Sequence, residues 1–214
     1  MTRILTALVL VPVVVVLVIW APEWALTLAL GWVGLLAFLE YIRLMMRMSS
    51  RVGPRVLLFL LGAVYIYVPL VLAVFLRRWN PHWLMFALIL SWAGDTAALY
   101  IGKAFGRHKL APVISPQKTW EGAAGSIAGA LIAGGIYAHY LIPDTPFAII
   151  LPLAAAGNIA GQLGDLTESA VKRRADVKDS GSSLPGHGGW LDRIDSMLFA
   201  VPVIYALVWC FRNF

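Results

Sequence analysis

The chain has 214 residues, of which 60% are hydrophobic and only 13% are charged. A soluble domain typically carries about 25% charged residues, so the composition excludes an ordinary soluble enzyme, and it equally excludes a disordered chain. Cys210 is the only cysteine, which excludes a secreted fold held together by disulfides. The composition therefore predicts a polytopic membrane protein.

Seven apolar segments set the expected architecture. A membrane-spanning helix needs about 20 apolar residues, and backbone amides in lipid must bond within their own segment. A β-barrel would alternate over about ten residues, which runs such as Val13–Ile19 do not. We expect one all-α membrane-embedded domain, residues 1–214, whose first segment is a retained helix rather than a signal peptide. The expected helices cover residues 4–22, 24–39, 56–76, 83–102, 122–143, 145–172 and 192–211.

The charged residues predict an orientation. Among the 17 Lys and Arg residues, all but Arg77, Arg78 and Arg212 fall on one side of these helices. Lys and Arg mark the cytoplasmic side, which predicts a cytoplasmic N-terminus and a multi-pass protein of the cell inner membrane. This topology and the attraction to anionic lipids explain the net charge of +6. No nucleic-acid partner is expected, because the bases are split among short loops.

The acidic residues predict a site on the same side. All but Glu23 and Asp144 lie with the bases or within the fourth segment. Acidic residues follow no positive-inside rule, so their position needs another cause. We therefore expect a polar site that faces the cytoplasm.

The end of the sixth segment carries three polar residues on one helix face. Asp165, Ser169 and Lys172 stand at i, i+4 and i+7. Snorkelling of charged side chains would explain Lys172 and the adjacent Arg173. It explains Asp165 poorly, because an unpaired carboxylate at the membrane boundary is costly.

A polar, glycine-rich loop follows this helix. It holds Lys178 and Asp179, and then His187, Gly188 and Gly189. Glycines between charged groups let backbone amides approach an anion, as in phosphate-binding nests. Many such runs are ordinary turns, so the loop gains its weight from the residues that come next.

Asp192, Arg193 and Asp195 stand directly before the last apolar segment. Acids favour helix starts through capping and the helix dipole, which explains one aspartate more readily than two. Paired carboxylates suit Mg²⁺, and nearby Lys and Arg suit phosphate. The pattern predicts metal-dependent phosphoryl or nucleotidyl transfer.

Two further residues are expected on the same side. Asp95 lies inside the fourth segment, where an ionisable residue is a functional candidate by default. Lys118 precedes the fifth helix and places a cation beside a helix N-terminus, which is an anion site.

These motifs resemble those of the phosphatidate cytidylyltransferase (CDP-diacylglycerol synthase) family over nearly the whole chain. The C-terminal signature comprises Ser169-x-x-Lys172-Arg173, Lys178-Asp179, Pro185-Gly186-His187-Gly188-Gly189 and Asp192-Arg193-x-Asp195. The other matching stretches are Trp92-Ala93-Gly94-Asp95-Thr96, Gly102-Lys103-x-Phe105-Gly106, Ser115-Pro116-x-Lys118-Thr119-x-Glu121-Gly122 and Gly164-Asp165-Leu166-x-Glu168-Ser169. The chain resembles a short member, because about two spans of the bacterial proteins are absent around Met48–Arg55.

The resemblance implies an enzyme of phospholipid biosynthesis. It would be a nucleotidyltransferase that converts CTP and phosphatidate, a membrane lipid, into CDP-diacylglycerol and pyrophosphate. The resemblance further implies Mg²⁺ bound by Asp165, Asp192 and Asp195, with room for a second, monovalent cation. Phosphates would be held by Lys118, Lys172, Arg173 and Arg193. Other substrate contacts would come from Asp95, Ser169, Lys178, Asp179, His187, Gly188 and Gly189.

Other functions stay open at this point. A related CTP-dependent lipid enzyme, such as a CDP-archaeol synthase or a polyprenol kinase, would share many of these features. A small transporter would also carry an intramembrane acid such as Asp95, although no inverted repeat is evident. An inactive paralogue with a scaffolding role is the third alternative. The sequence leaves open whether the chain forms a homodimer and whether the absent spans affect activity.

Overall fold

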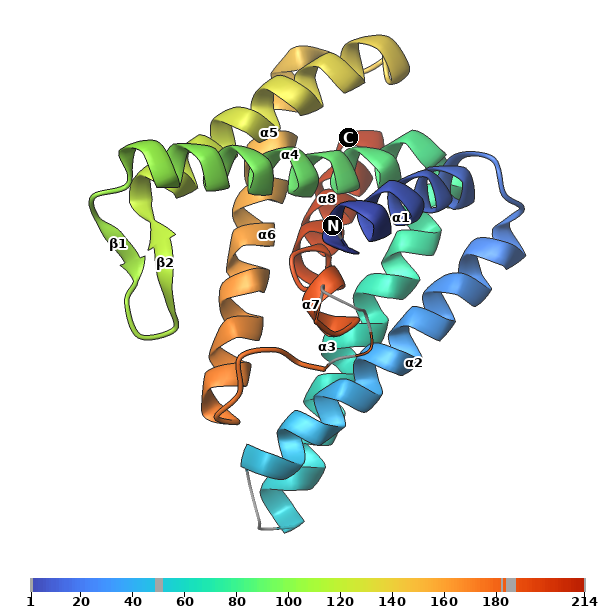
Figure 1. Cartoon of the computed structure of the whole chain (residues 1–214). Helices are drawn as coiled ribbons and strands as arrows, with labels where there is room; N and C mark the ends of the chain where they lie inside the picture. Colours follow the sequence, from blue (N-terminus) through green and yellow to red (C-terminus); the bar gives the residue numbers. More distant parts are fainter. Residues whose placement is uncertain (1, 49–51, 182, 184–187, 214) are drawn as a thin grey trace.

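The computed structural model describes residues 2–48, 52–181, 183 and 188–213. It consists of helices and one short hairpin (Figure 1). The helices are α1 (Thr2–Ile19), α2 (Glu23–Met48), α3 (Val52–Trp79), α4 (Pro81–Phe105), α5 (Trp120–Leu141), α6 (Phe147–Arg174), α7 (Leu191–Ile194) and α8 (Met197–Asn213). The strands are β1 (Lys109–Ala111) and β2 (Ser115–Thr119).

The helices confirm the prediction of an all-α polytopic membrane protein. Within the described residues, six helices are long and apolar enough to cross a membrane. The first of the seven expected segments corresponds to α1, in which Leu8–Ile19 forms a shorter apolar helix. A proline at position 22 disfavours helical backbone at the residue before it, and α1 ends at Ile19. Large apolar side chains such as Leu60 and Ile132 are exposed, as expected for surfaces in contact with lipid.

Several helix boundaries differ from the expected ones. The second segment continues as a helix to Met48, and the sixth continues to Arg174. The last segment is split into α7 and α8, because a turn at Asp195 and Ser196 separates them. The orientation of the helices in the membrane stays a prediction.

The hairpin between α4 and α5 was not expected. Its strands pair antiparallel, with Lys109 opposite Thr119 and Ala111 opposite Ser115. Thr119 then begins α5 as its N-cap, because its hydroxyl accepts a hydrogen bond from the Gly122 amide at 3.1 Å. The hairpin thus fixes the residues that lead into α5.

The helices pack around a core formed mainly by α4, α6 and α8. Phe86 and Leu90 of α4 are fully buried in it, together with Ile150 of α6 and Ile204 of α8. Helix α5 packs along α4, and in Figure 1 the two run together across α6. This arrangement brings the hairpin beside α6.

The polar connections gather at one end of the bundle. In Figure 1 the hairpin lies at the left and the lower end of α6 at the lower left, whereas the α5–α6 connection lies at the top and the α1–α2 connection at the upper right. At the opposite end, Arg77 donates hydrogen bonds to the carbonyl oxygens of Val18 and Ala21 and so joins α3 to the end of α1. The site residues are therefore carried by the α6 end, the hairpin and α7.

Candidate active site

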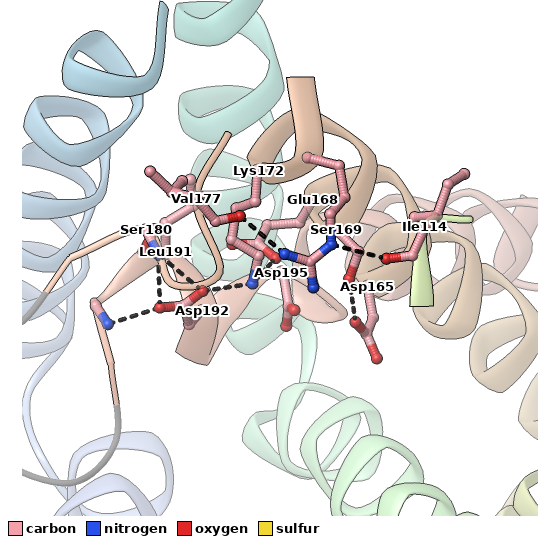
Figure 2. Close-up of polar contacts among 12 residues, drawn as sticks. Ile114, Asp165, Glu168, Ser169, Lys172, Val177, Ser180, Leu191, Asp192 and Asp195 are labelled. Carbon is pink, nitrogen blue, oxygen red and sulfur yellow. Dashed lines mark hydrogen bonds and ion pairs between the residues drawn. The ribbon is translucent and has the colours of Figure 1, made fainter. Parts of the chain in front are cut away.

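A buried ionic cluster surrounds Lys172 at the end of α6. Its Nζ lies 2.5 Å from Oε2 of Glu168 and 2.7 Å from Oδ1 of Asp192 (Figure 2). The exposed fractions of the three side chains are 12% for Lys172, 0% for Glu168 and 6% for Asp192. An isolated charge is costly to bury. The ion pair between Lys172 and Asp192 offsets that cost and fixes the position of both side chains.

Asp192 is also held by the backbone of the loop that precedes it. Its Oδ2 accepts hydrogen bonds from the amides of Gly189, at 2.7 Å, and Ser180, at 3.1 Å (Figure 2). Gly188 has a φ of 77°, a backbone conformation that favours glycine. Two backbone amides of the loop thus bind an anion of the chain itself, Asp192. Binding of a phosphate by this loop stays a prediction.

Asp165 pairs with a lysine from the hairpin. The Nζ of Lys118 lies 2.6 Å from Oδ2 of Asp165, and the Ser169 hydroxyl lies 3.4 Å from Oδ1. Asp165, Ser169 and Lys172 all lie within helix α6, and the contact between Asp165 and Ser169 follows from their i, i+4 spacing. Strand β2 carries Lys118, so the hairpin explains how that lysine reaches the site.

Arg173 ties the end of α6 to its surroundings. Its guanidinium donates to the carbonyl oxygens of Ile114 in the hairpin, at 3.2 Å, and of Val177, at 2.9 Å. These contacts hold the hairpin against α6. A phosphate contact from Arg173 stays a prediction.

Asp95 and Asp195 stand near Asp165. The Oδ1 of Asp195 accepts a hydrogen bond from the Ser196 amide at 2.7 Å. The backbone of Asp195 packs against Gly164, the residue before Asp165, and Asp95 lines the same cavity as Asp165. Ionised carboxylates that lie close together repel one another in the absence of a cation.

The donor set fits a Mg²⁺ ion in part. Mg²⁺ binds one or two protein carboxylates together with phosphates and water, and Asp165 with Asp195 supplies such a pair. Both oxygens of Asp192 already accept from Lys172 or from amides. Within the described residues, no group of three His, Cys, Asp or Glu side chains is arranged to hold a metal ion. Binding of one ion by Asp165, Asp192 and Asp195 together stays a prediction.

The remaining predicted residues are less constrained. Lys178 and Asp179 are exposed and form no hydrogen bond or ion pair with the part of the chain that the structure describes. Arg193 is exposed at α7. His187 lies outside the described residues.

A polar cavity of about 640 Å³ opens beside the hairpin. Asp95, Asp165 and Gln162 line one part of it. Lys103, Lys109 and Lys118 line it as well. Its mixture of ammonium and carboxylate groups suits a polyanion bound together with a cation.

An apolar cavity of about 370 Å³ lies between α1, α2, α3, α4 and α8. Its lining is almost wholly aliphatic, with Trp92 and Trp190 among the exceptions. Among the residues that the structure describes, Arg193 is the only charged one in this lining. Trp92 lines this cavity and Asp95 lines the polar one, three residues apart on α4, so the two cavities border the same stretch of that helix.

Sequence reasoning missed two buried acids. Glu168 stands four residues before Lys172, a spacing that already indicates a helical ion pair. Glu40 is 2% exposed in α2 and accepts hydrogen bonds from the loop before α7. No local pattern predicts that contact, although a glutamate at the end of an apolar run is a signal in itself.

Sequence reasoning also missed a polar network within the membrane-spanning region. The amide of Asn158 donates to the Ser126 hydroxyl at 3.1 Å and to the Leu90 carbonyl at 3.3 Å. Gln162 donates to the side-chain oxygen of Asn158 at 2.8 Å. The network joins α4, α5 and α6 directly beside the polar cavity.

Residues 44–211 match the Cytidylyltransferase family. A phosphatidate cytidylyltransferase of Bacillus subtilis is 44% identical over 133 residues, which are 62% of this chain and 49% of that protein. The Haemophilus influenzae protein of the same name is 46% identical over 123 residues, 56% of this chain and 43% of the relative. The one from Staphylococcus saprophyticus is 39% identical over 148 residues, 69% of this chain and 54% of the relative.

The chain spans about half the length of the curated relatives it matches. The family match covers well over half of the chain and contains Asp95, the hairpin, and all of α6, α7 and the segment between them. The chain therefore belongs to the Cytidylyltransferase family.

Proposed function

We propose that this chain is a phosphatidate cytidylyltransferase of the cell inner membrane. It would form CDP-diacylglycerol for phospholipid biosynthesis. The observation that carries the proposal is that an apolar and a polar cavity border the same stretch of α4, the first at Trp92 and the second at Asp95. A reaction between a water-soluble nucleotide and a membrane lipid needs two such sites side by side.

The polar cavity would take the triphosphate of CTP. Lys103, Lys109 and Lys118 would supply its cationic contacts. Asp165 and Asp195 would hold Mg²⁺, which neutralises charge on phosphate oxygens when it is bound. The lysine of the Lys118–Asp165 pair would then be free to contact phosphate.

The apolar cavity would take one acyl chain of the phosphatidate. Its aliphatic lining excludes water, and Arg193 stands where the lipid phosphate would face the polar cavity. Arg193 would bind that phosphate and direct one of its oxygens toward the nucleotide. Most of the second acyl chain would remain in the bilayer.

In the proposed reaction, an oxygen of the phosphatidate phosphate attacks the α-phosphorus of CTP. A new phosphorus–oxygen bond forms, and the bond from the α-phosphorus to the bridging oxygen breaks, which releases pyrophosphate. The attacking phosphate is anionic at neutral pH, so no general base is required. The task of the chain is to position two polyanions and to offset their repulsion, with Lys172 fixed near the reacting groups by Glu168 and Asp192.

The test uses purified chain in nanodiscs with Mg²⁺ and phosphatidate. CTP labelled at the α-phosphorus should transfer its label to the lipid, whereas CTP labelled at the γ-phosphorus should not. Label from only the γ position would instead indicate a polyprenol-kinase type of reaction, tested with a polyprenol acceptor. A preference for an ether-linked isoprenoid glycerol phosphate would indicate a CDP-archaeol synthase. No label in any lipid would refute the proposal.

A further inference from the structure

Glu40 is a buried acid that no catalytic role accounts for. It lies in α2, is 2% exposed, and precedes the first residue of the family match at position 44. A carboxylate this deeply buried is costly unless its oxygens are hydrogen-bonded. Its partners should therefore reveal what it holds.

All the hydrogen bonds of Glu40 within the described residues come from the loop and the helix start that follow α6. Its Oε2 accepts from the Ser180 hydroxyl and from the Leu191 amide, both at 3.0 Å. Its Oε1 accepts from the Ser183 hydroxyl at 3.0 Å. These donors are neutral, and no cation pairs with Glu40 in the described part of the chain.

The loop is built around this carboxylate. At Gly189, an added Cβ would overlap both the Glu40 carboxylate and the Ser180 hydroxyl. At Gly181, an added Cβ would stand 2.6 Å from Oε1 of Glu40. In Figure 1 the chain leaves the lower end of α6 and crosses toward α2 and α3 before it reaches α7. The loop therefore packs closely against the Glu40 carboxylate at Gly181 and Gly189.

The same loop residues hold the active-site aspartate. Ser180 donates its hydroxyl to Glu40 and its backbone amide to Asp192. Leu191 donates its amide to Glu40 and is the residue directly before Asp192. Asp192 in turn holds Lys172. The first residue of α7 is thus bonded directly to Glu40, and the second, Asp192, is linked to Glu40 through Ser180.

We propose that Glu40 is a positioning residue for the cytidylyl transfer. It anchors Ser180, Ser183 and Leu191 to α2 and so sets the orientation of Asp192 and Lys172. It touches no substrate and acts as an acceptor of hydrogen bonds rather than as a charge. This inference rests on the proposed function only where activity is the measurement.

The acceptor role makes a sharp prediction for two variants. In Glu40→Gln, the amide oxygen can accept from Ser180 and Leu191, and the amide nitrogen can donate to the Ser183 hydroxyl. Glu40→Ala leaves all three donors unsatisfied. We expect E40A to lower kcat about 10–100-fold, as is typical when a supporting contact of a site is lost, with KM for CTP changed less than about threefold. We expect E40Q to restore kcat to within about threefold of wild type.

The control is Glu23→Gln, at the first residue of α2. Glu23 forms an exposed ion pair with Arg78, and such pairs contribute little. Its kcat should equal that of the wild type. If E40A does not fold, the double variant S180A/S183A removes two of the three hydrogen bonds and should show the same loss of kcat with KM preserved.

Hydrogen exchange gives a readout that does not depend on activity. In E40A the amides of residues 178–191 should exchange faster, while those of α4 and α5 stay protected. Unchanged exchange, or wild-type kcat in E40A or in S180A/S183A, would overturn the proposal. An E40Q protein as inactive as E40A would overturn it too, because it would indicate a role for the charge. An inactive wild type would refute the proposed function, but the exchange measurement would still decide the anchoring role.

Discussion

Replacing Lys172 by methionine would leave the carboxylates of Glu168 and Asp192 buried without the ammonium group between them. The ammonium group of Lys172 lies within 2.7 Å of one oxygen of each of these two acids. Methionine keeps most of the volume of the side chain but removes both contacts. The two carboxylates would then face each other at 0% and 6% exposure.

The expected loss of unfolding free energy is about 3–5 kcal/mol, the range observed when one partner of a buried ion pair is removed. Solvent screening lowers this expected loss of free energy only slightly, because the Lys172 side chain is only 12% exposed. Adding Glu168→Gln to the same chain removes one of the two buried acids that the ammonium group contacted. The double variant should therefore recover part of the loss, with a coupling energy of about 0.5–3 kcal/mol.

The assay is unfolding by SDS in mixed micelles, followed by far-ultraviolet circular dichroism for the wild type, both single variants and the double variant. Lys178→Met is the matched control, because Lys178 is exposed and lacks a partner among the described residues. It should change stability by less than about 0.5 kcal/mol. A similarly small change in K172M would refute the argument that the cluster is held by its lysine.

Three further predictions test the site and its support. Asp195→Asn should abolish Mg²⁺-dependent transfer of the CTP label to lipid, while the exposed Asp144→Asn should not; retained activity in D195N would remove Asp195 from the proposed metal site. Gly188→Ala should lower kcat about tenfold, because φ is 77° there and the new Cβ would stand 2.5 Å from Oδ2 of Asp192, at a strain of about 1–2 kcal/mol. Asn158→Leu should lower the unfolding free energy by about 1–3 kcal/mol in the same micelle assay, because it leaves buried polar partners unpaired; an unchanged value would contradict that role for the network.

Much of the fold could be predicted because each membrane-spanning helix is encoded by one continuous apolar segment. The lipid environment forces each long apolar segment to satisfy its own backbone as a helix, and α2 to α6 follow the predicted segments. The common face of Asp165, Ser169 and Lys172 also depends only on helical periodicity. The hairpin was not predicted, because two strands of three and five residues leave no periodic signal of useful length.

The missing parts of the site depend on contacts between distant residues. Ser180 follows Glu40 by 140 residues, and Asn158 follows Leu90 by 68. Neither spacing is visible as a motif in a single sequence. The individual residues still carried a signal, since a glutamate, an asparagine or a glutamine inside an apolar segment needs a partner.

The length of α6 decides how far this chemistry stands from the hydrocarbon. Its 28 residues extend about 42 Å at a rise of about 1.5 Å per residue, and the hydrocarbon layer is about 30 Å thick. The surplus of about 12 Å is about eight residues, which corresponds to the stretch 167–174. With Phe147 at the far face of the hydrocarbon layer, we expect Glu168, Lys172 and Arg173 at the depth of the lipid headgroups and Asp165 at the boundary. The proposed lipid substrate would then meet these side chains without rising out of its leaflet, and the extra two turns of α6 would spare it the cost of exposing its chains to water.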